Sequence, residues 1–228
     1  MFSDNLENLA LAGHLVQINF DQSLTSKQQD WLSIIENLMI LPKASALRNK
    51  QLCLGRLCAA EALMTSGLDE SLALNIAIGQ NREPLWPNGY IGSISHDRIG
   101  AVAIANSTSK VRALGVDVEE WGRMKPEIAE KILHQNDLRD VPGLGQNELL
   151  TLIFSAKETL YKALYPIVQT YFGFDSASVT TIDLKRGQLT IELTRNLNHE
   201  FGVDFGSTFR VFWSQNKMRL ITFLAILE

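Results

Sequence analysis

The segment RALGVDVE, residues 112 to 119, is short and rich in β-branched and small residues, which is typical of a β-strand. Successive side chains of a strand point to opposite faces, so Asp117 and Glu119 are expected on the same side. Neighbouring carboxylates repel each other unless a cation or hydrogen-bond donors compensate, and Mg²⁺ prefers oxygen ligands. An isolated D-x-E also fits an exposed sheet face or a solvated strand end, and this ordinary interpretation is favoured for the motif by itself.

Strands and helices are predicted on the N-terminal side of this segment. Alternating or β-branched residues predict strands over residues 14 to 20, 90 to 96 and 101 to 105. Helical spacing of apolar residues predicts helices over residues 26 to 38 and 44 to 64, and the polar side of the second carries Arg48, Lys50 and Arg56. Two prolines in NREPLWPN, residues 81 to 88, exclude regular structure and predict a loop with an exposed aromatic residue.

The C-terminal side of the segment repeats this mixture of helices and strands. Helices are predicted over residues 126 to 134 and 147 to 164. Two hairpins are predicted from loop length and turn residues, with strands over residues 178 to 184, 188 to 194, 209 to 214 and 218 to 227. The order of elements favours an α+β fold of two similar halves that meet near Ala113, with boundaries at 1–113 and 114–228.

The composition argues against several classes of protein. The longest apolar runs, such as residues 221 to 227, are far below the roughly 20 residues needed to cross a bilayer. Residues 1 to 5 include Asp4 in place of a basic signal-peptide region, so a cytoplasmic protein without a membrane span is expected. The net charge of −4 argues against general nucleic-acid binding. Cys53 and Cys58 fit neither a zinc pair nor a disulfide and are expected to be free buried thiols.

A second segment, FSAKETLYKALYP, residues 154 to 166, places charges of both signs in an amphipathic helix. Glu158 and Lys162 are four residues apart and share a helix face, which fits a surface ion pair worth a few tenths of a kcal/mol. The alternative takes Glu158 as a third metal-binding carboxylate, with Lys157 and Lys162 as phosphate contacts. His96 ends a predicted strand after Ser95, where it could donate to a phosphate.

These residues together suggest Mg²⁺-assisted chemistry on a phosphate ester or anhydride. The sequence contains no G-x-x-x-x-G-K-[ST], G-x-S-x-G or H-E-x-x-H, so P-loop, α/β-hydrolase and zincin functions lack support. Residue spacing alone does not distinguish further among Mg²⁺-dependent reactions.

In this order, GSISH, GVDVE and FSAKETLYK resemble the signature of the 4′-phosphopantetheinyl transferase superfamily, surfactin-synthetase-activating type. REPLWPNGYIGSISH and FSAKETLYKALYP resemble its enterobactin synthetase component D branch in particular. The resemblance implies a pseudo-dimer of two α+β halves with coenzyme A in the cleft between them. Since one chain would then form the whole site, a monomer is expected.

The resemblance also implies a role for each matching residue. Asp117, Glu119 and Glu158 match the family's magnesium ligands, while Lys157 and Lys162 match lysines that hold coenzyme A phosphates or assist proton transfer. The other matches are to residues around coenzyme A: His96 with Ser95 at the pyrophosphate or 3′-phosphate, Arg56 and Arg48 at the 3′-phosphate, and Arg82, Glu83 and Pro84 near the adenine. Phe154 stands where many members have Trp, which affects packing more than chemistry.

The activity implied by the family is transfer of 4′-phosphopantetheine from coenzyme A to a serine of an apo acyl or peptidyl carrier protein, with release of adenosine 3′,5′-bisphosphate. Glu158, Lys157 and a water on the metal are alternative bases for the serine proton. Siderophore, polyketide and fatty acid synthesis all use such carriers, and the enterobactin-like motifs favour the first. Two alternatives remain: a non-catalytic coenzyme A-binding module and a Mg²⁺-dependent phosphohydrolase.

Overall fold

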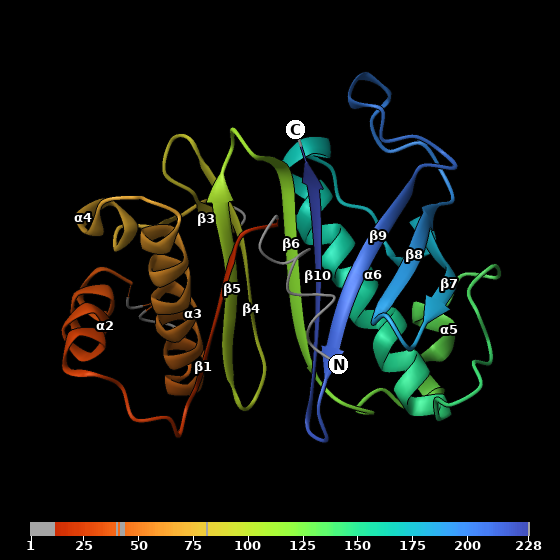
Figure 1. Ribbon diagram of the computed structural model, residues 1–228, viewed down its shortest axis with the longest axis horizontal. Coiled ribbons are helices and arrows are strands. Elements are labelled where there is room, and N and C mark those ends of the chain that lie inside the picture. Colours follow the sequence, from red (N-terminus) through yellow and green to blue (C-terminus); the bar gives the residue numbers. More distant parts are fainter. Residues whose placement is uncertain (1–11, 40, 42–43, 81, 228) are drawn as a thin grey trace. The chain divides into compact units, whose positions relative to one another are not determined.

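The computed structural model of the chain describes residues 12–39, 41, 44–80 and 82–227 (Figure 1). The chain divides between Leu114 and Gly115 into two compact units. We refer to the described residues up to Leu114 as the N-terminal unit and to Gly115–Ala225 as the C-terminal unit. Within the described residues, no helix has the length and apolar character needed to cross a bilayer.

The N-terminal unit places a long helix against a small antiparallel sheet (Figure 1). Its elements are β1 (His14–Asn19), α2 (Ser26–Met39), α3 (Ala46–Thr65), α4 (Glu70–Ala73), β2 (Ala77–Ile78), β3 (Pro84–Leu85), β4 (Tyr90–His96) and β5 (Gly100–Ser107). The sheet has the order β1-β5-β4, and both pairs are antiparallel. α3 packs on all three strands, and α2 packs on α3.

Small residues allow α3 to lie close to the sheet. Ala59 and Ala60 of the helix and Ala101 and Ala103 of the strand are fully buried in one core. Such close-packed contacts leave little room for larger side chains. Cys53 and Cys58 are both buried and neither forms a disulfide, which confirms the predicted thiols.

Three predictions for this unit were wrong. Pro84 and Leu85 form β3, which pairs with β2, since proline is tolerated in a short edge strand that does not need its N–H. Trp86 is partly buried against the core and is not an exposed aromatic residue. Arg56 is buried and therefore does not lie on a polar side of α3. Asn81 and residues 1–5 lie outside the described residues.

The C-terminal unit combines a larger sheet with a second long helix. Its elements are η1 (Pro126–Ile128), α5 (Ala129–Ile132), α6 (Gln146–Val168), η2 (Phe174–Ser176), β7 (Ala177–Asp183), β8 (Gln188–Leu193), η3 (His199–Phe201), β9 (Thr208–Gln215) and β10 (Arg219–Leu227), and its first strand is β6 (Val111–Glu120). The sheet has the order β6-β10-β9-β8-β7. The antiparallel pairs β7–β8 and β9–β10 confirm both predicted hairpins.

α6 is longer than the apolar pattern predicts. It continues through Pro166 to Val168 and ends at Gln169, whose left-handed backbone donates its N–H to the carbonyl of Tyr165. Pro166 lies in the last turn, where it removes only one backbone hydrogen bond of the helix, so the helix continues for two residues beyond it. The predicted end at Leu164 was therefore too early. Conversely, the predicted helix over 126 to 134 is only η1 followed by α5.

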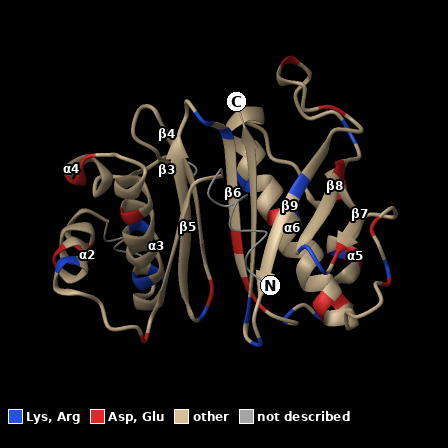
Figure 2. Cartoon of the chain, viewed as in Figure 1, with Lys and Arg blue, Asp and Glu red and all other residues tan. Residues whose placement is uncertain are grey.

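The mixture of helices and sheets agrees with the predicted fold class. In both units the first strand is hydrogen-bonded to the last strand, β1 to β5 and β6 to β10, and the long helix lies between first and second strand in the sequence. Acidic positions on β6 and charges of both signs on α6 are marked in Figure 2.

Candidate functional site

Gly115 allows β6 to lie directly against α6. A side chain at this position would clash with the carbonyl oxygen of Thr159, so only glycine fits without a shift of strand or helix. Two residues later, Asp117 points toward the same helix, and Lys162 of α6 donates to the carbonyl of Val116 at 3.2 Å. The glycine of GVDVE therefore permits the contact on which the site is built.

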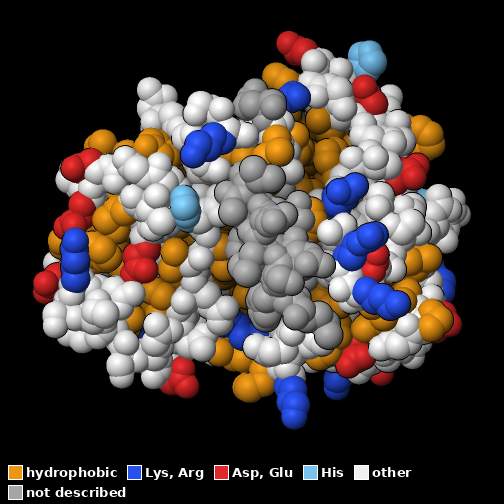
Figure 3. Space-filling view, in the orientation of Figure 1, with side chains coloured by type: hydrophobic (Ala, Val, Ile, Leu, Met, Phe, Trp, Pro, Cys, Tyr) orange, Lys and Arg blue, Asp and Glu red, His pale blue; other side chains and the backbone are white. Residues whose placement is uncertain are grey.

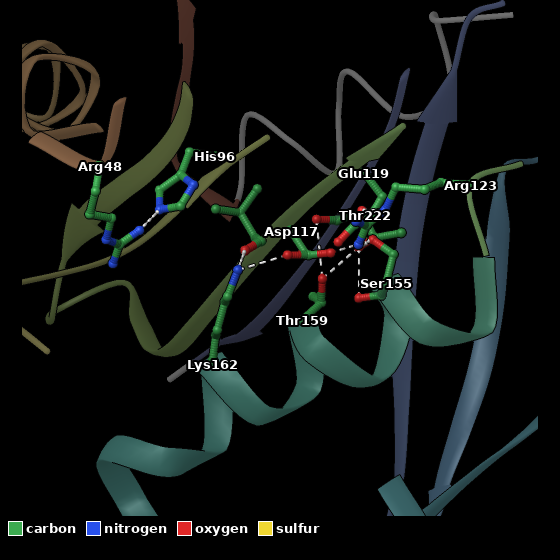
Figure 4. Close-up of polar contacts among 10 residues, drawn as sticks. Arg48, His96, Asp117, Glu119, Arg123, Ser155, Thr159, Lys162 and Thr222 are labelled. Carbon is green, nitrogen blue, oxygen red and sulfur yellow. Dashed lines mark hydrogen bonds and ion pairs between the residues drawn. The ribbon is translucent and has the colours of Figure 1, made fainter. Parts of the chain in front are cut away.

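Asp117 is the best-connected carboxylate of the site. It is buried, with 4% of its surface exposed. Lys162 Nζ donates to one carboxylate oxygen at 2.8 Å, and Ser155 Oγ donates to the other at 2.8 Å (Figure 4). These charge-assisted bonds compensate the burial of the negative charge and fix the direction of the carboxylate.

Three buried hydroxyl groups support Asp117 from the side of α6 and β10. Ser155 Oγ lies 2.8 Å from Thr222 Oγ1, which lies 2.6 Å from Thr159 Oγ1 (Figure 4). None of the three was a predicted site residue. A signal was available for two of them, because Ser155 and Thr159 are four residues apart and share one helix face. Thr222, in contrast, is 67 residues from Ser155.

Glu119 is a partly buried carboxylate with a perturbed pKa. Burial, followed by repulsion from Asp117, raises the pKa of Glu119 to about 7. Arg123 opposes this shift through an ion pair whose Nε lies 2.9 Å from Oε2 of Glu119 (Figure 4). A carboxylate that is costly to ionise in its own environment is a favourable partner for a cation.

Glu158 is coupled to the same charges from α6. Burial raises its pKa, the charge of Lys162 lowers it, and the charge of Asp117 raises it. Among the described residues, however, no group of three or more His, Cys, Asp and Glu side chains has the arrangement of a formed metal site. The charge of Asp117 acts on both Glu119 and Glu158, and all three are ligands of the kind that Mg²⁺ prefers, while Asp117 and Glu119 contact basic side chains.

Lys157 is paired with a carboxylate other than these three. It is buried with Asp137, and its Nζ lies 2.6 Å from Oδ2 of that residue. It also donates to the carbonyls of Ile132 and Phe174, at 2.9 and 3.0 Å. Burial lowers the pKa of Lys157, and the charge of Asp137 raises it. A phosphate contact from Lys157 would require this buried pair to open.

The predicted residues of the N-terminal unit fall into two groups. Arg48 of α3 is exposed, and its guanidinium contacts Nε2 of His96 at the end of β4 (Figure 4). Ser95, next to His96, is buried. Arg48 and His96, both matched through the resemblance to residues around coenzyme A, thus form one polar group.

Arg56 has a different environment from Arg48. Its guanidinium donates to the carbonyls of Ile76 and Ala77, at 3.1 and 3.4 Å. Burial lowers its pKa to about 10. Arg82 and Glu83 lie in the turn between β2 and β3, and Pro84 begins β3: Arg82 has a φ of 68°, and the N–H of Gly79 donates to the carbonyl of Glu83 at 2.8 Å.

An aromatic cavity of about 120 Å³ lies beside Glu158. Its lining also includes Lys157, Leu160, Tyr161, Tyr171, Phe172, Gly173, Phe174 and Ala177. Tyr161 packs against both Tyr171 and Phe172, with ring centroids 5.9 and 5.0 Å apart. An apolar cavity next to a polar group is a common form of small-molecule site.

Comparison with known proteins identifies the family. Residues 113–213 match the model of the 4′-phosphopantetheinyl transferase superfamily, and residues 36–106 match the 4′-phosphopantetheinyl transferase N-terminal domain. The chain is 34% identical over 182 residues to enterobactin synthase component D of Salmonella typhi, covering 77% of this chain and 72% of the relative. The chain belongs to the 4′-phosphopantetheinyl transferase superfamily.

Two further relatives extend this result. Enterobactin synthase component D of Salmonella austin is 30% identical over 228 residues, covering 96% of this chain and 89% of the relative. The 4′-phosphopantetheinyl transferase PptT of Mycobacterium tuberculosis is 28% identical over 147 residues, 64% of this chain and 63% of the relative. The resemblance seen in the sequence is confirmed. A 4′-phosphopantetheinyl transferase moves phosphopantetheine from coenzyme A to a carrier protein, so these are the substrates of this chain.

Proposed function

We propose that the chain transfers 4′-phosphopantetheine to a serine hydroxyl of an apo acyl or peptidyl carrier protein in a Mg²⁺-dependent reaction, and that it releases adenosine 3′,5′-bisphosphate. The observation that carries the proposal is the coupling of buried Asp117 to Glu119, Glu158 and Lys162 where β6 meets α6. Acidic and basic groups gathered at one place suit a reaction in which charge moves on a pyrophosphate.

Asp117, Glu119 and Glu158 would hold the Mg²⁺ ion. The raised pKa of Glu119 and that of Glu158 support this role, because burial and the charge of Asp117 make their ionisation costly without a cation. When bound, Mg²⁺ supplies positive charge that offsets the charge developing on the pyrophosphate as the anhydride bond breaks. Ser155 keeps the carboxylate of Asp117 in one orientation.

Basic side chains of the chain would bind the phosphates. Lys162 is a quarter exposed and paired to Asp117, so its ammonium group can also face a substrate oxygen. The adjacent Arg48 and His96 offer donors to a phosphate, which supports the predicted contact with coenzyme A. Arg56 is occupied by two carbonyl groups, which favours a structural role for it. The adenine contacts of Arg82, Glu83 and Pro84 stay a prediction.

Glu158 is the base that we favour for the carrier serine. It lines the aromatic cavity, where part of the pantetheine arm is proposed to bind. Lys157 is a weaker choice because its ammonium group has three buried acceptors. The cavity is too small for all of coenzyme A, and its apolar lining suits part of the pantetheine arm.

The remaining parts of the proposal come from the resemblance and from the relatives. A pseudo-dimer with coenzyme A in a cleft between its halves, with halves 1–113 and 114–228, is carried by the family resemblance alone, as are a monomeric state and a cytoplasmic location. The relatives named enterobactin synthase component D favour a carrier from a non-ribosomal peptide siderophore system. Residues 121 to 146 are proposed to contact the carrier.

One assay separates this proposal from the two alternatives. The chain is incubated with coenzyme A, Mg²⁺ and an apo carrier protein, and the carrier is weighed by mass spectrometry. A mass gain equal to phosphopantetheine supports the transferase, and its loss with a metal chelator supports the role of Mg²⁺. Cleavage of coenzyme A without a mass gain would indicate a phosphohydrolase. Binding without either change would indicate a non-catalytic module.

A further inference from the structure

Asp137 is a buried carboxylate that the site described above does not use. It lies in the loop between α5 and α6, with 4% of its surface exposed. Its Oδ1 accepts the backbone N–H of Val179 at 2.6 Å, and its Oδ2 accepts that of His134 at 2.6 Å. Oδ2 also accepts Lys157 Nζ at 2.6 Å. The carboxylate therefore joins its own loop, β7 and α6.

Lys157 completes this network from α6. Besides Asp137, its ammonium group donates to the carbonyls of Ile132, at the end of α5, and Phe174, at the start of η2. The other charges that act on it are Arg139, which lowers its pKa, and Asp175, which raises it. Because an ammonium group has three N–H donors, these three acceptors fix its direction.

The network borders the aromatic cavity. Phe174, whose carbonyl is held by Lys157, lines the cavity together with Phe172 and Gly173. Glu158 lines the same cavity and follows Lys157 directly on α6. The distance between this aromatic wall and the helix that carries Glu158 therefore depends on bonds made by Lys157.

Stability alone is a weak reason for such a pair. A buried ion pair is often no more stabilising than apolar side chains of similar volume, because both charges lose their hydration. Its bonds are directional, however, and directional bonds set positions more narrowly than apolar contacts do. The pair is thus better suited to fixing a geometry than to adding free energy of unfolding.

We propose that Asp137 is a positioning residue of the transferase: through Lys157 it holds the aromatic wall of residues 172 to 174 at a fixed distance from Glu158. The inference rests on the proposed roles of Glu158 and of the cavity. It assigns Lys157 to this network and not to the phosphates of coenzyme A, and it gives Asp137 no contact with substrate.

The first test is Asp137→Asn, which keeps the shape of the side chain and removes its charge. The matched control is Asp140→Asn, in the same loop and exposed. Asp137→Asn is expected to lower Tm by about 10 °C, because it leaves a buried ammonium group without its counter-charge. Below that Tm, the Kd of coenzyme A is expected to rise about tenfold by calorimetry, since the wall that contacts the arm is no longer fixed.

Adenosine 3′,5′-bisphosphate, which lacks the pantetheine arm, distinguishes positioning from general damage. Its Kd is expected to be unchanged in Asp137→Asn. Equal weakening of both ligands, or an unchanged Kd for coenzyme A, would overturn the inference. If Asp137→Asn does not fold, Asp137→Glu carries the same comparison, because it keeps the charge while lengthening the side chain.

The double variant Asp137→Leu with Lys157→Met separates stability from positioning. Removing both charges together is expected to restore most of the Tm lost in Asp137→Asn, while the selective loss of coenzyme A affinity persists. Recovery of both would show that the pair serves stability alone. A wild-type protein without transfer to any apo carrier would refute the proposed function instead, whatever the ligand affinities of the Asp137 variants.

Discussion

The long helices of the two units, α3 and α6, bury different kinds of side chain. In the described chain, the buried side of α3 is apolar apart from Arg56, whereas α6 buries Thr151, Ser155, Lys157 and Thr159. Burying a polar group is costly unless it is hydrogen-bonded, and each of these groups has a bonded partner. The helix with the buried polar groups, α6, is the one that contacts Asp117 in the candidate site.

This contrast explains why similar arrangements of elements carry different chemistry. Both helices lie between the first and second strands of their units in the sequence, and in both units the first strand is bonded to the last. On α3 the buried face sets packing distance with small residues, while on α6 it orients Asp117 and the wall beside Glu158. Elsewhere, on the face shown in Figure 3, acidic and basic side chains are interspersed.

The largest effect on the transfer rate is expected from removing the carboxylate of Asp117, which the polar face of α6 orients. Asp117→Ala is expected to lower the transfer rate by about 1,000-fold or more, because it removes a proposed metal ligand and the partner of Lys162. The measurement is the rate of mass gain of an apo carrier, with circular dichroism to check folding. Asp30→Ala, exposed on α2, is the control and should behave as wild type. Near-normal transfer by Asp117→Ala would contradict the assignment of the metal ligands.

Lys162→Ala is expected to lower the rate by about 100-fold, because Lys162 would both compensate Asp117 and stabilise the leaving group. Lys185→Ala, an exposed turn lysine, is its control. Measuring the rate over a range of Mg²⁺ concentrations separates the two roles, since loss of phosphate binding persists at saturating metal. Equal rates for the two variants would remove Lys162 from the site.

Gly115→Ala tests the contact between β6 and α6 instead of a charge. The added methyl group meets the carbonyl of Thr159, so overpacking is expected to lower the free energy of unfolding by about 2 to 3 kcal/mol. Transfer should fall as well, because Asp117 follows two residues later on the displaced strand. Urea unfolding measures the effect, and Gly89→Ser in an open turn is the control, with only the cost of its positive φ. Unchanged stability would mean that the strand and helix separate easily.

Much of the fold could be predicted from the sequence because it depends on local periodicity. Apolar spacing gave α2, α3 and α6 within a few residues, alternation gave β1, and loop length with turn residues gave both hairpins. These signals need only the residues that make up each element.

The rest depends on partners that are distant in the sequence. Asp137 meets Lys157 across 20 residues and Val179 across 42, and no period or short motif reports such a contact. Arg56 was misplaced for the same reason: its spacing on α3 does not reveal that the carbonyls of Ile76 and Ala77 accept its protons inside the core. Lys157 stands in a recognised motif, yet the motif could not show which way its side chain turns.

The smallest expected effect concerns the single polar residue on the buried side of α3 in the described chain. Arg56→Met is expected to lower the free energy of unfolding by about 1 to 2 kcal/mol, since the carbonyls of Ile76 and Ala77 lose a donor while a costly buried charge is also removed. Its affinity for coenzyme A should stay close to that of wild type.

Arg48→Met, exposed on the same helix, should show the reverse: unchanged stability and an affinity about tenfold weaker, because it loses a phosphate donor. Calorimetry on both variants measures the affinities, and urea unfolding measures the stabilities. A large loss of affinity in Arg56→Met would show that its guanidinium leaves the core to bind the 3′-phosphate, and the difference between α3 and α6 would then be smaller than their buried side chains indicate.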